Sequence, residues 1–137
     1  MITKETIYCR PGTPYLTRWC LRTRWFGVYV HRFEESDIPV MHDHPWNFVS
    51  IVLRGGYAEY RPGHTDPCNR WFTVDDRTVR RAGSVAFRRA EQLHHVQLIR
   101  QPTWTLIIHG PKRKEWGFVV NGKWVHWREY HETRGAA

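Results

Sequence analysis

Apolar and polar residues alternate along short stretches of this chain, and Gly, Pro, Asn and Asp separate the stretches from one another. Alternation with a period of two is typical of strands that bury one face, and short strands between turn residues are typical of sandwiches and barrels. The pattern predicts strands over residues 24–33, 47–54, 57–61, 70–74, 84–88, 94–99, 103–109, 116–120 and 123–127.

Two glycine-containing dipeptides separate neighbouring predicted strands. Gly55-Gly56 lies between 47–54 and 57–61, and Asn121-Gly122 lies between 116–120 and 123–127. Both are typical of tight hairpins, because two-residue hairpin turns need residues that accept positive φ. Helix is scarce, and only 15–22 is predicted as a short helix. The sequence therefore predicts an all-β antiparallel barrel over about residues 24–130, with a short N-terminal extension and a ligand site in the barrel mouth or interior.

The composition is that of an ordinary globular protein. The chain has 137 residues, 41% of them hydrophobic and 25% charged, and shows neither repeats nor a composition break, so we expect one domain over residues 1–137. Eight Trp residues indicate a core of large rings or an aromatic-lined pocket. No apolar run is long enough to span a membrane, and the N-terminus lacks the apolar core of a signal peptide, which predicts a cytoplasmic location.

The three cysteines do not form a recognisable motif. Cys9, Cys20 and Cys68 are odd in number and widely spaced. That spacing predicts neither a disulfide framework nor a zinc knuckle, and we interpret the three side chains as reduced thiols that pack in the fold.

Positive charge predominates, with 21 Lys and Arg against 13 Asp and Glu and a formal net charge of +8. Such a charge attracts nucleic acid, phosphorylated ligands or carboxylate substrates. The basic residues form short clusters at 77–81, 88–89 and 112–114. No known nucleic-acid-binding motif accompanies them, so solvated turns and outward strand faces are the favoured interpretation. Arg54 and Arg88 are candidates to bind a substrate carboxylate.

Histidines provide the first candidate chemistry. His42 and His44 are two residues apart, so on an extended segment both rings point to the same side, where one cation can bridge them. The alternative interpretation is a solvated loop, because Asp43 and Pro45 favour turns.

A second histidine pair strengthens the metal hypothesis. Val96 and Leu98 share a strand face with His94, whereas His95 lies on the opposite face. His94 is therefore expected inside the barrel, where a histidine needs either a hydrogen-bond partner or a metal, and His95 is expected at the surface or beside the site. The H-x-H pair nearby favours a metal ligand.

Two stretches resemble the motifs of a known family. Residues 41–57, with His42 and His44 followed by a strand and glycines, are similar to the first motif of the cupin superfamily, and residues 83–96, with His94, are similar to the second. The resemblance implies an RmlC-like double-stranded β-helix, a jelly-roll barrel with one metal between the two motifs. The glutamate that often follows the second histidine is replaced by Asn47 and Phe48, so His42, His44 and His94 are the predicted ligands. Asn47 and Glu59 are the candidates for a fourth ligand.

Three neutral imidazoles leave the charge of a cation uncompensated and leave coordination positions open, which suits an anionic or chelating substrate, water or dioxygen. Iron(II) is the first choice of metal, and zinc, manganese, nickel and copper are alternatives. The two histidine segments also resemble those of three-histidine thiol dioxygenases. The Ser-x-His-x-Tyr run of those enzymes corresponds to residues 105–109, where Ile107 replaces the histidine, so a thiol substrate is not predicted.

Further side chains are candidates for hydrogen bonds to the ligands or for proton transfer, namely Tyr29, Tyr57 and His109, with core packing as the alternative. The leading hypothesis is a non-haem iron oxygenase acting on a small anionic or chelating molecule. The second is a non-catalytic cupin that binds a small ligand or a metal, and the third is a basic module that binds nucleic acid. Exposed Trp and strand edges also favour a homodimer.

Overall fold

The protein folds into antiparallel strands followed by one short helix in the part of the chain that the computed structural model describes, residues 1–63, 65–66, 69–73 and 75–135. The predicted all-β class is confirmed. The strands are β1 (Ile2–Arg10), β2 (Thr13–Arg22), β3 (Gly27–Phe33), β4 (Phe48–Arg61), β5 (Thr65–Asp66), β6 (Asn69–Thr73), β7 (Asp76–Arg81), β8 (Val85–Arg88), β9 (His95–His109), β10 (Gly117–Val120) and β11 (Lys123–His126), and the helix is α1 (Trp127–Gly135).

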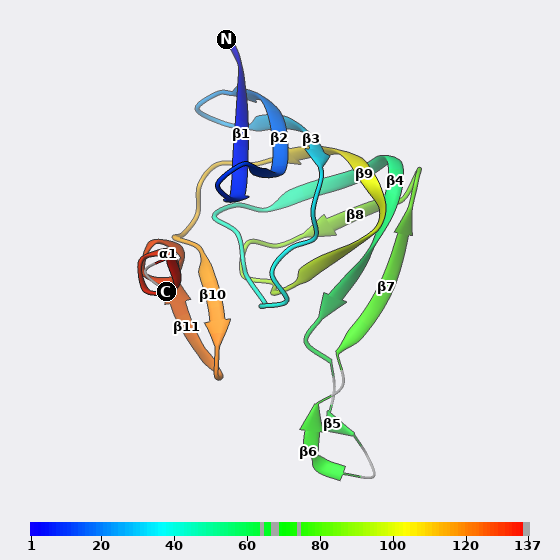
Figure 1. The fold of residues 1–137 in the computed structure, drawn as a ribbon, viewed down its shortest axis with the longest axis vertical. Coiled ribbons are helices and arrows are strands. Elements are labelled where there is room, and N and C mark those ends of the chain that lie inside the picture. Colours follow the sequence, from blue (N-terminus) through cyan, green and yellow to red (C-terminus); the bar gives the residue numbers. More distant parts are fainter. Residues whose placement is uncertain (64, 67–68, 74, 136–137) are drawn as a thin grey trace.

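The main sheet has the order β1-β2-β3-β9-β4-β7, with β8 paired to β4 (Figure 1). The long strands β4 and β9 form its centre. The first half of β4 pairs with β8 and the second half of β9, and the second half of β4 pairs with β7 and the first half of β9. The two long strands therefore belong to both parts of the curved sheet and enclose the interior of the barrel.

The hairpin predicted at Gly55-Gly56 is wrong, because β4 continues through both glycines. The register with β9 shifts between Val52 and Tyr57, and Gly55 has a φ of 84°. Irregularities of this kind bend a strand, and glycine reaches a positive φ without a steric penalty. The glycines bend β4 instead of reversing it. The two strands predicted over 94–99 and 103–109 likewise form the single strand β9, which begins at His95.

The helix predicted over 15–22 is also wrong, because this segment is strand β2. Its Thr, Tyr and Trp residues favour strands, and Leu16 and Cys20 are buried from one face at 5% and 1% exposure. β1 and β2 form a hairpin that extends the sheet beyond β3, which begins at Gly27 rather than at Arg24. The N-terminal extension is thus an edge of the same sheet.

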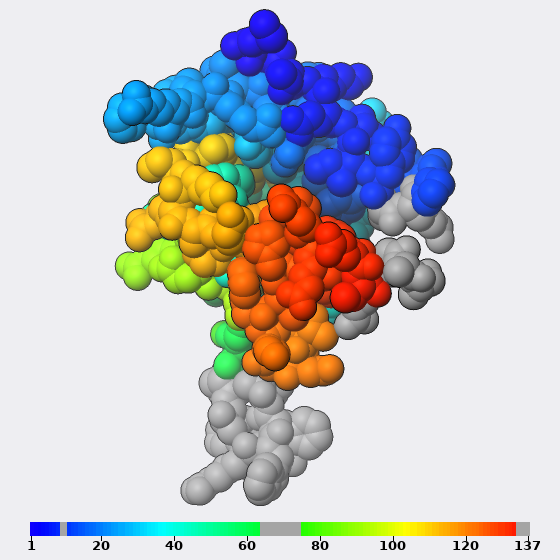
Figure 2. All heavy atoms as spheres, turned by 90° about the vertical axis from the view of Figure 1, so that its left-hand side faces the viewer, coloured from blue at the N-terminus to red at the C-terminus, as the bar shows by residue number. Residues whose placement is uncertain are grey.

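The C-terminal segment contains one confirmed turn and one missed helix. Asn121 and Gly122 have φ values of 52° and 76° and connect β10 to β11, as the sequence predicted. The strand predicted over 123–127 ends at His126, and the unpredicted helix α1 begins at Trp127. In Figure 2 this segment, in orange and red, covers the middle of one face of the molecule below the N-terminal strands.

Two clusters of contacting buried side chains lie in the core of the described residues, one of Cys20, Tyr29, Phe48 and Ile107 and the other of Val52, Tyr57 and Val96. The buried thiol of Cys20 packs as expected. Cys68, Val74 and the side chain of Cys9 lie outside the part of the chain that the structure describes. No helix among the described residues is long and apolar enough to cross a membrane.

Candidate metal centre

Backbone pairing brings the three predicted ligands together. The amide N of His42 donates to the carbonyl O of His94 at 3.0 Å, and the reciprocal bond from His94 is also 3.0 Å. Residues that oppose each other in this way project their side chains to the same face, and His44 follows at the next position on that face. One nitrogen of each ring lies within 4.8 Å of the others.

The geometry therefore assembles the histidines that the sequence selected. His95 is separate from them, and its ring stacks on Tyr60 with centroids 4.8 Å apart and an interplanar angle of 13°. Metal binding itself stays a prediction at this point.

Asp43, between the two histidines of the pair, points the opposite way. Its carboxylate is only 4% exposed, accepts the backbone N–H of Gly117 at 2.7 Å and Trp124 Nε1–H at 3.1 Å, and also binds Lys114. The middle residue of the H-x-H pair therefore attaches the C-terminal segment to the ligand segment. These hydrogen bonds of Asp43 hold the backbone of His42 and His44 on the side away from their rings.

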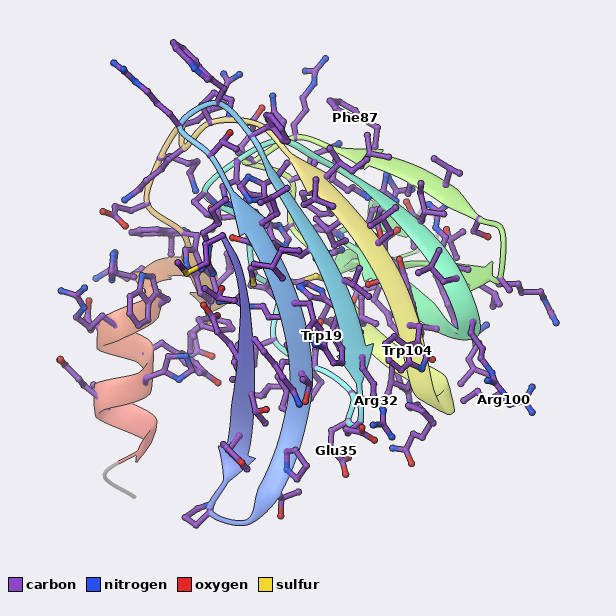
Figure 3. The ribbon with its side chains drawn as sticks, turned by 90° about the horizontal axis from the view of Figure 1, so that it is seen from above. Trp19, Arg32, Glu35, Phe87, Arg100 and Trp104 are labelled. Carbon is purple, nitrogen blue, oxygen red and sulfur yellow. The ribbon has the colours of Figure 1, made fainter. Side chains whose placement is uncertain are left out.

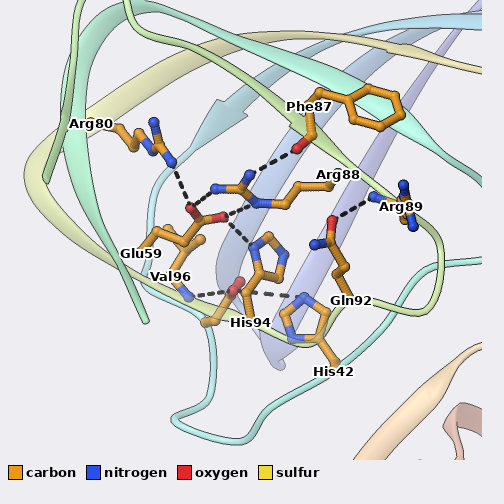
Figure 4. Close-up of polar contacts among 10 residues, drawn as sticks. His42, Glu59, Arg80, Phe87, Arg88, Arg89, Gln92, His94 and Val96 are labelled. Atoms are coloured by element: carbon orange, nitrogen blue, oxygen red, sulfur yellow. Dashed lines mark hydrogen bonds and ion pairs between the residues drawn. The ribbon is translucent and has the colours of Figure 1, made fainter. Parts of the chain in front are cut away.

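A buried carboxylate holds the third histidine (Figure 4). Glu59 Oε2 lies 2.7 Å from His94 Nδ1 and 3.1 Å from Arg88 Nε, and Oε1 lies 3.3 Å from Arg80 Nη2 and also binds Arg88. Burial acts to raise the pKa of Glu59, but the hydrogen bonds from His94 and Arg88 hold that pKa well below its ordinary value. Because the ionised carboxylate can only accept, His94 Nδ1 donates to it, and Nε2 is the ring nitrogen that remains to bind a metal.

The rings of His42 and His44 are neutral at physiological pH. Burial lowers the pKa of His42 to about 4, although Asp37, with Oδ2 3.9 Å from His42 Nε2, acts in the opposite direction. Burial also lowers the pKa of His44 well below its ordinary value, with His94 and His42 adding to the shift. Neutral imidazoles have free lone pairs, which is the state in which they bind metals.

The site has one further feature that fits a bound cation. Among the described residues, the buried Nδ1 atom of His44 has no hydrogen-bond partner. An all-nitrogen donor set of this kind suits iron(II), zinc and other first-row divalent ions. The residues present therefore fit a transition metal.

Aromatic rings that the sequence analysis did not select enclose His44. Trp46 stacks on His109 with centroids 4.2 Å apart, lies 5.9 Å from His44, and is followed by Phe48 at 4.6 Å from His44. Trp46 and Phe48 follow His44 at every second residue, so the alternation already visible in the sequence could have identified them.

The C-terminal segment supplies a second group of rings. Trp116 lies 6.4 Å from His42 and Phe118 lies 5.9 Å from it, while the backbone of Phe118 is paired with that of His42. These contacts connect elements more than 70 residues apart, and no local pattern in the sequence indicates them. The rings restrict the access of water to this side of the histidines.

The predicted helper residues lie farther from the histidines than expected. Tyr29 accepts a hydrogen bond from Arg22 Nε at 3.0 Å, and its ring is 4.8 Å from that of His109. His109 Nδ1 faces the carbonyl of Gly110 at 2.8 Å. Both rings contact Trp46, which lies between His109 and His44. They support the wall of the site.

Tyr57 is a core residue. It is 6% exposed and packs with Val52 and Val96, and burial raises the pKa of its hydroxyl despite a hydrogen bond with Ser50. The structure thus favours packing, the alternative interpretation of this side chain.

Neither candidate for a fourth ligand joins the donor cluster. Asn47 Oδ1 accepts the backbone N–H of Ala90 at 2.8 Å and so fixes the loop before His94. Glu59 binds His94 on its Nδ1 side, and Arg88 is held by Glu59, so Arg88 is not free to bind a substrate carboxylate. Within the described residues, the cluster of donor atoms consists of histidine nitrogens.

Besides His44, two further polar side chains of the described residues, His31 and Thr105, lie in the barrel interior without hydrogen-bond partners. His31 on β3 and Thr105 on β9 oppose each other in register. Both ring nitrogens of His31 and the hydroxyl oxygen of Thr105 are buried and lack a hydrogen bond among the described residues. Burial lowers the pKa of His31 to about 3, with a further contribution from Arg18. Buried groups of this kind bind water or a ligand.

Comparison with known proteins identifies the fold. No protein-family model and no curated protein sequence matches the chain. Among solved structures, an RmlC-like cupin from Shewanella frigidimarina is 18% identical, with a TM-score of 0.56 and coverage of 82% of this chain and 87% of that one. KdgF from a Halomonas species is 14% identical, with a TM-score of 0.56 and coverage of 80% and 89%.

The iron(II) form of HppE is 14% identical, with a TM-score of 0.56 and coverage of 77% of this chain. This chain spans 56% of the length of that one. These likenesses agree with the curved antiparallel sheet described above. The chain therefore has the RmlC-like cupin fold, a double-stranded β-helix.

Proposed function

We propose that this protein is a metal-dependent cupin in which His42, His44 and His94 bind one divalent transition metal, with iron(II) as the first choice. The observation that carries the proposal is the convergence of three imidazoles, that of His94 buried and those of His42 and His44 partly buried, with donor nitrogens within 4.8 Å of one another. The iron(II) form of HppE, a structure with the same fold, supports iron as the metal.

The proposed reaction is the oxygenation of a small anionic or chelating substrate, with dioxygen as the second substrate. A divalent ion bound by three neutral ligands retains its full charge and open positions, and it supplies Lewis acidity and redox chemistry there. An anionic substrate compensates this charge, which no carboxylate of the described residues does from within the donor cluster.

The protein side chains have separate tasks in this proposal. Glu59 accepts a hydrogen bond from His94 Nδ1 and so orients the ring with Nε2 turned away from the carboxylate. Trp46 and Phe118 restrict water around the other two rings. His31 can donate one hydrogen bond from a ring N–H, and Thr105 can donate one from its hydroxyl, to an acceptor in the interior.

Metal content tests the first part of the proposal. The purified full chain is loaded with iron(II) under anaerobic conditions, desalted and measured by elemental analysis. We expect about one metal per chain, a loss in His94→Ala, and retention in the matched control His95→Ala, because His95 stacks on Tyr60 away from the cluster. Wild-type protein that stays folded without taking up metal contradicts the proposal, as does equal uptake by both variants.

Oxygen consumption tests the second part. The iron-loaded protein is mixed with a panel of small carboxylic acids, hydroxy acids and thiols, and dioxygen is followed with an electrode. Substrate-dependent uptake that is absent in His94→Ala supports an oxygenase. A metal-loaded protein that binds these acids without consuming dioxygen is instead a passive binder, and that result overturns the oxygenase assignment.

A further inference from the structure

Three arginines surround a hollow on the outer face of the sheet. The hollow has a volume of about 340 Å³ and is lined by Arg32, Arg54, Arg100, Gln101, Pro102 and Trp104. These residues come from β3, β4 and β9, which are neighbours in the sheet. Trp104 lies opposite Arg32 on one side and opposite Arg54 on the other. Figure 3 shows Arg32 and Trp104 together near one end of the strands.

Alternation along the strands separates this hollow from the metal centre. Arg32 follows His31, whose ring nitrogens are buried, and Trp104 lies between Thr103 and Thr105, which are 0% and 1% exposed. Successive side chains of a strand point to opposite faces of the sheet. The hollow is therefore on the far side of the sheet from the interior, and it is a site distinct from the histidine cluster.

The positive charge in the hollow is largely uncompensated. Among the described residues, the guanidinium groups of Arg54 and Arg100 form no hydrogen bond or ion pair, and the residues that line the hollow include no carboxylate. Arg32 Nε is 2.8 Å from Glu34 Oε1, which compensates one cation of the three. Two guanidinium groups beside the same hollow repel each other unless an anion lies between them.

A pair of stacked indoles makes one wall of the hollow rigid. Trp19 on β2 stacks on Trp104 with centroids 5.6 Å apart and an interplanar angle of 12°. Lys4 Nζ lies 5.6 Å from the centroid of Trp19, and the guanidinium of Arg32 lies 5.8 Å from that of Trp104. The indoles thus lie beside cationic groups on the outer face of the sheet and offer apolar surface next to them.

We propose that this hollow is a binding site for the phosphate group of a phosphorylated ligand. Guanidinium groups bind phosphate oxygens through paired hydrogen bonds, and a phosphate presents enough acceptor oxygens to engage more than one arginine. The hollow is larger than a phosphate ion alone, so the remainder of the ligand rests on Trp104 and Pro102. The phosphate belongs either to a small phosphorylated molecule or to the backbone of a single-stranded nucleic acid.

Calorimetric titration of the full chain tests this site. The probes are inorganic phosphate, adenosine monophosphate, a 12-nucleotide single-stranded RNA, and acetate as the carboxylate comparison. We expect the phosphate-containing probes to bind and the variant R54Q/R100Q to bind them roughly tenfold more weakly, or worse, for each guanidinium lost. Phosphate probes that do not bind, or that bind the variant equally, overturn the proposal, as does acetate that binds as tightly as phosphate.

A matched control comes from a second hollow of about 280 Å³, which contains Arg128 and Lys112 together with the acidic Glu115. R128Q removes a cation there, and we expect it to leave phosphate binding unchanged. Loss of binding in R128Q equal to that in R54Q/R100Q means that net charge alone governs binding and rejects the site. Circular dichroism and metal content verify that each variant is folded and that the histidine cluster is intact.

The same titrations distinguish the two sources of the phosphate. A nucleic-acid partner requires tighter binding to the RNA than to the mononucleotide. A nucleic-acid partner also requires log Kd to depend linearly on the logarithm of the salt concentration. The slope of that line should fall by roughly 0.7 for each arginine removed. A small phosphorylated ligand requires the mononucleotide to bind as tightly as the RNA.

Discussion

Two glutamates of this protein each lie between two arginines, but at different depths. Glu59, between Arg80 and Arg88, has a side chain that is 2% exposed, whereas Glu5, between Arg18 and Arg22, has one that is 34% exposed. The composition of the two clusters is almost the same. The deep cluster also holds a predicted metal ligand, and the shallow one borders the N-terminal edge of the sheet.

The difference in depth determines what each cluster contributes. Around Glu59 the charges are removed from water, so each depends on the others for compensation, and loss of one leaves its partners buried and unpaired. Around Glu5 water screens the charges, and the attraction offsets little more than the entropy lost by the long side chains. The buried cluster is suited to hold His94 in one orientation, and the exposed cluster is not suited to that task.

Removal of the buried carboxylate should have the largest effect. We expect Glu59→Ala to lower the free energy of unfolding by about 3–5 kcal/mol, because Arg88 is left buried without its partner. Glu5→Ala should cost about 1 kcal/mol or less. Urea unfolding of the metal-free proteins measures both changes. Equal losses in the two variants would show that depth is not the cause of the difference.

Metal affinity is the second property that should differ between variants of the two clusters. Glu59→Gln retains the shape of the side chain but loses the charge that orients His94, and such a change typically weakens metal binding by about 10–100-fold. Glu5→Gln is the control and should bind metal like the wild type. Zinc(II) titration against a competing chelator measures the affinities. Unchanged affinity in Glu59→Gln would mean that the carboxylate has no part in presenting the ligand.

The sequence selected the three histidines that the structure brings together because the determinants of that choice are local. Spacing placed His42 and His44 on one side of an extended segment, and the alternation after His94 selected it over His95. The structure brings the three selected rings together. Glu59 was predicted as a candidate for a fourth ligand, but its contact with His94 across 35 residues depends on how β4 and β9 pair, which no local pattern gives.

The errors in the fold prediction have the same origin. A glycine pair between two apolar runs is compatible with both a reversal and a bend, and only the pairing of β4 with β9 on both sides of Gly55 decides for the bend. The 15–22 segment has apolar residues on both faces, so its period was ambiguous until its pairing with β1 and β3 defined it as a strand.

A smaller effect is expected within the exposed cluster. Tyr29→Phe removes the oxygen that accepts a hydrogen bond from Arg22 at 3.0 Å and should lower the free energy of unfolding by about 1 kcal/mol. The ring itself stays packed against His109, so metal content should not change. Thermal unfolding checks the first expectation, with Tyr8→Phe, at a site 58% exposed, as the control. A loss of metal in Tyr29→Phe would place the hydroxyl in the metal centre after all.

The acid response of Glu5 is the smallest effect and the sharpest test of depth. Hydrogen bonds from Arg22 and Arg18 lower the pKa of Glu5 from 4.5 to about 2. Because the folded state holds this proton less tightly than the unfolded state, the stabilisation is complete above about pH 5 and is lost as the pH falls toward 2. The difference in unfolding free energy between wild type and Glu5→Gln, about 1 kcal/mol or less near pH 6, should therefore vanish near pH 2. It should also shrink at about 1 M salt, where the Debye length is only about 3 Å. If the difference in unfolding free energy persists at high salt, the Glu5 cluster is shielded from solvent ions as the Glu59 cluster is. The contrast between the two clusters would then not hold.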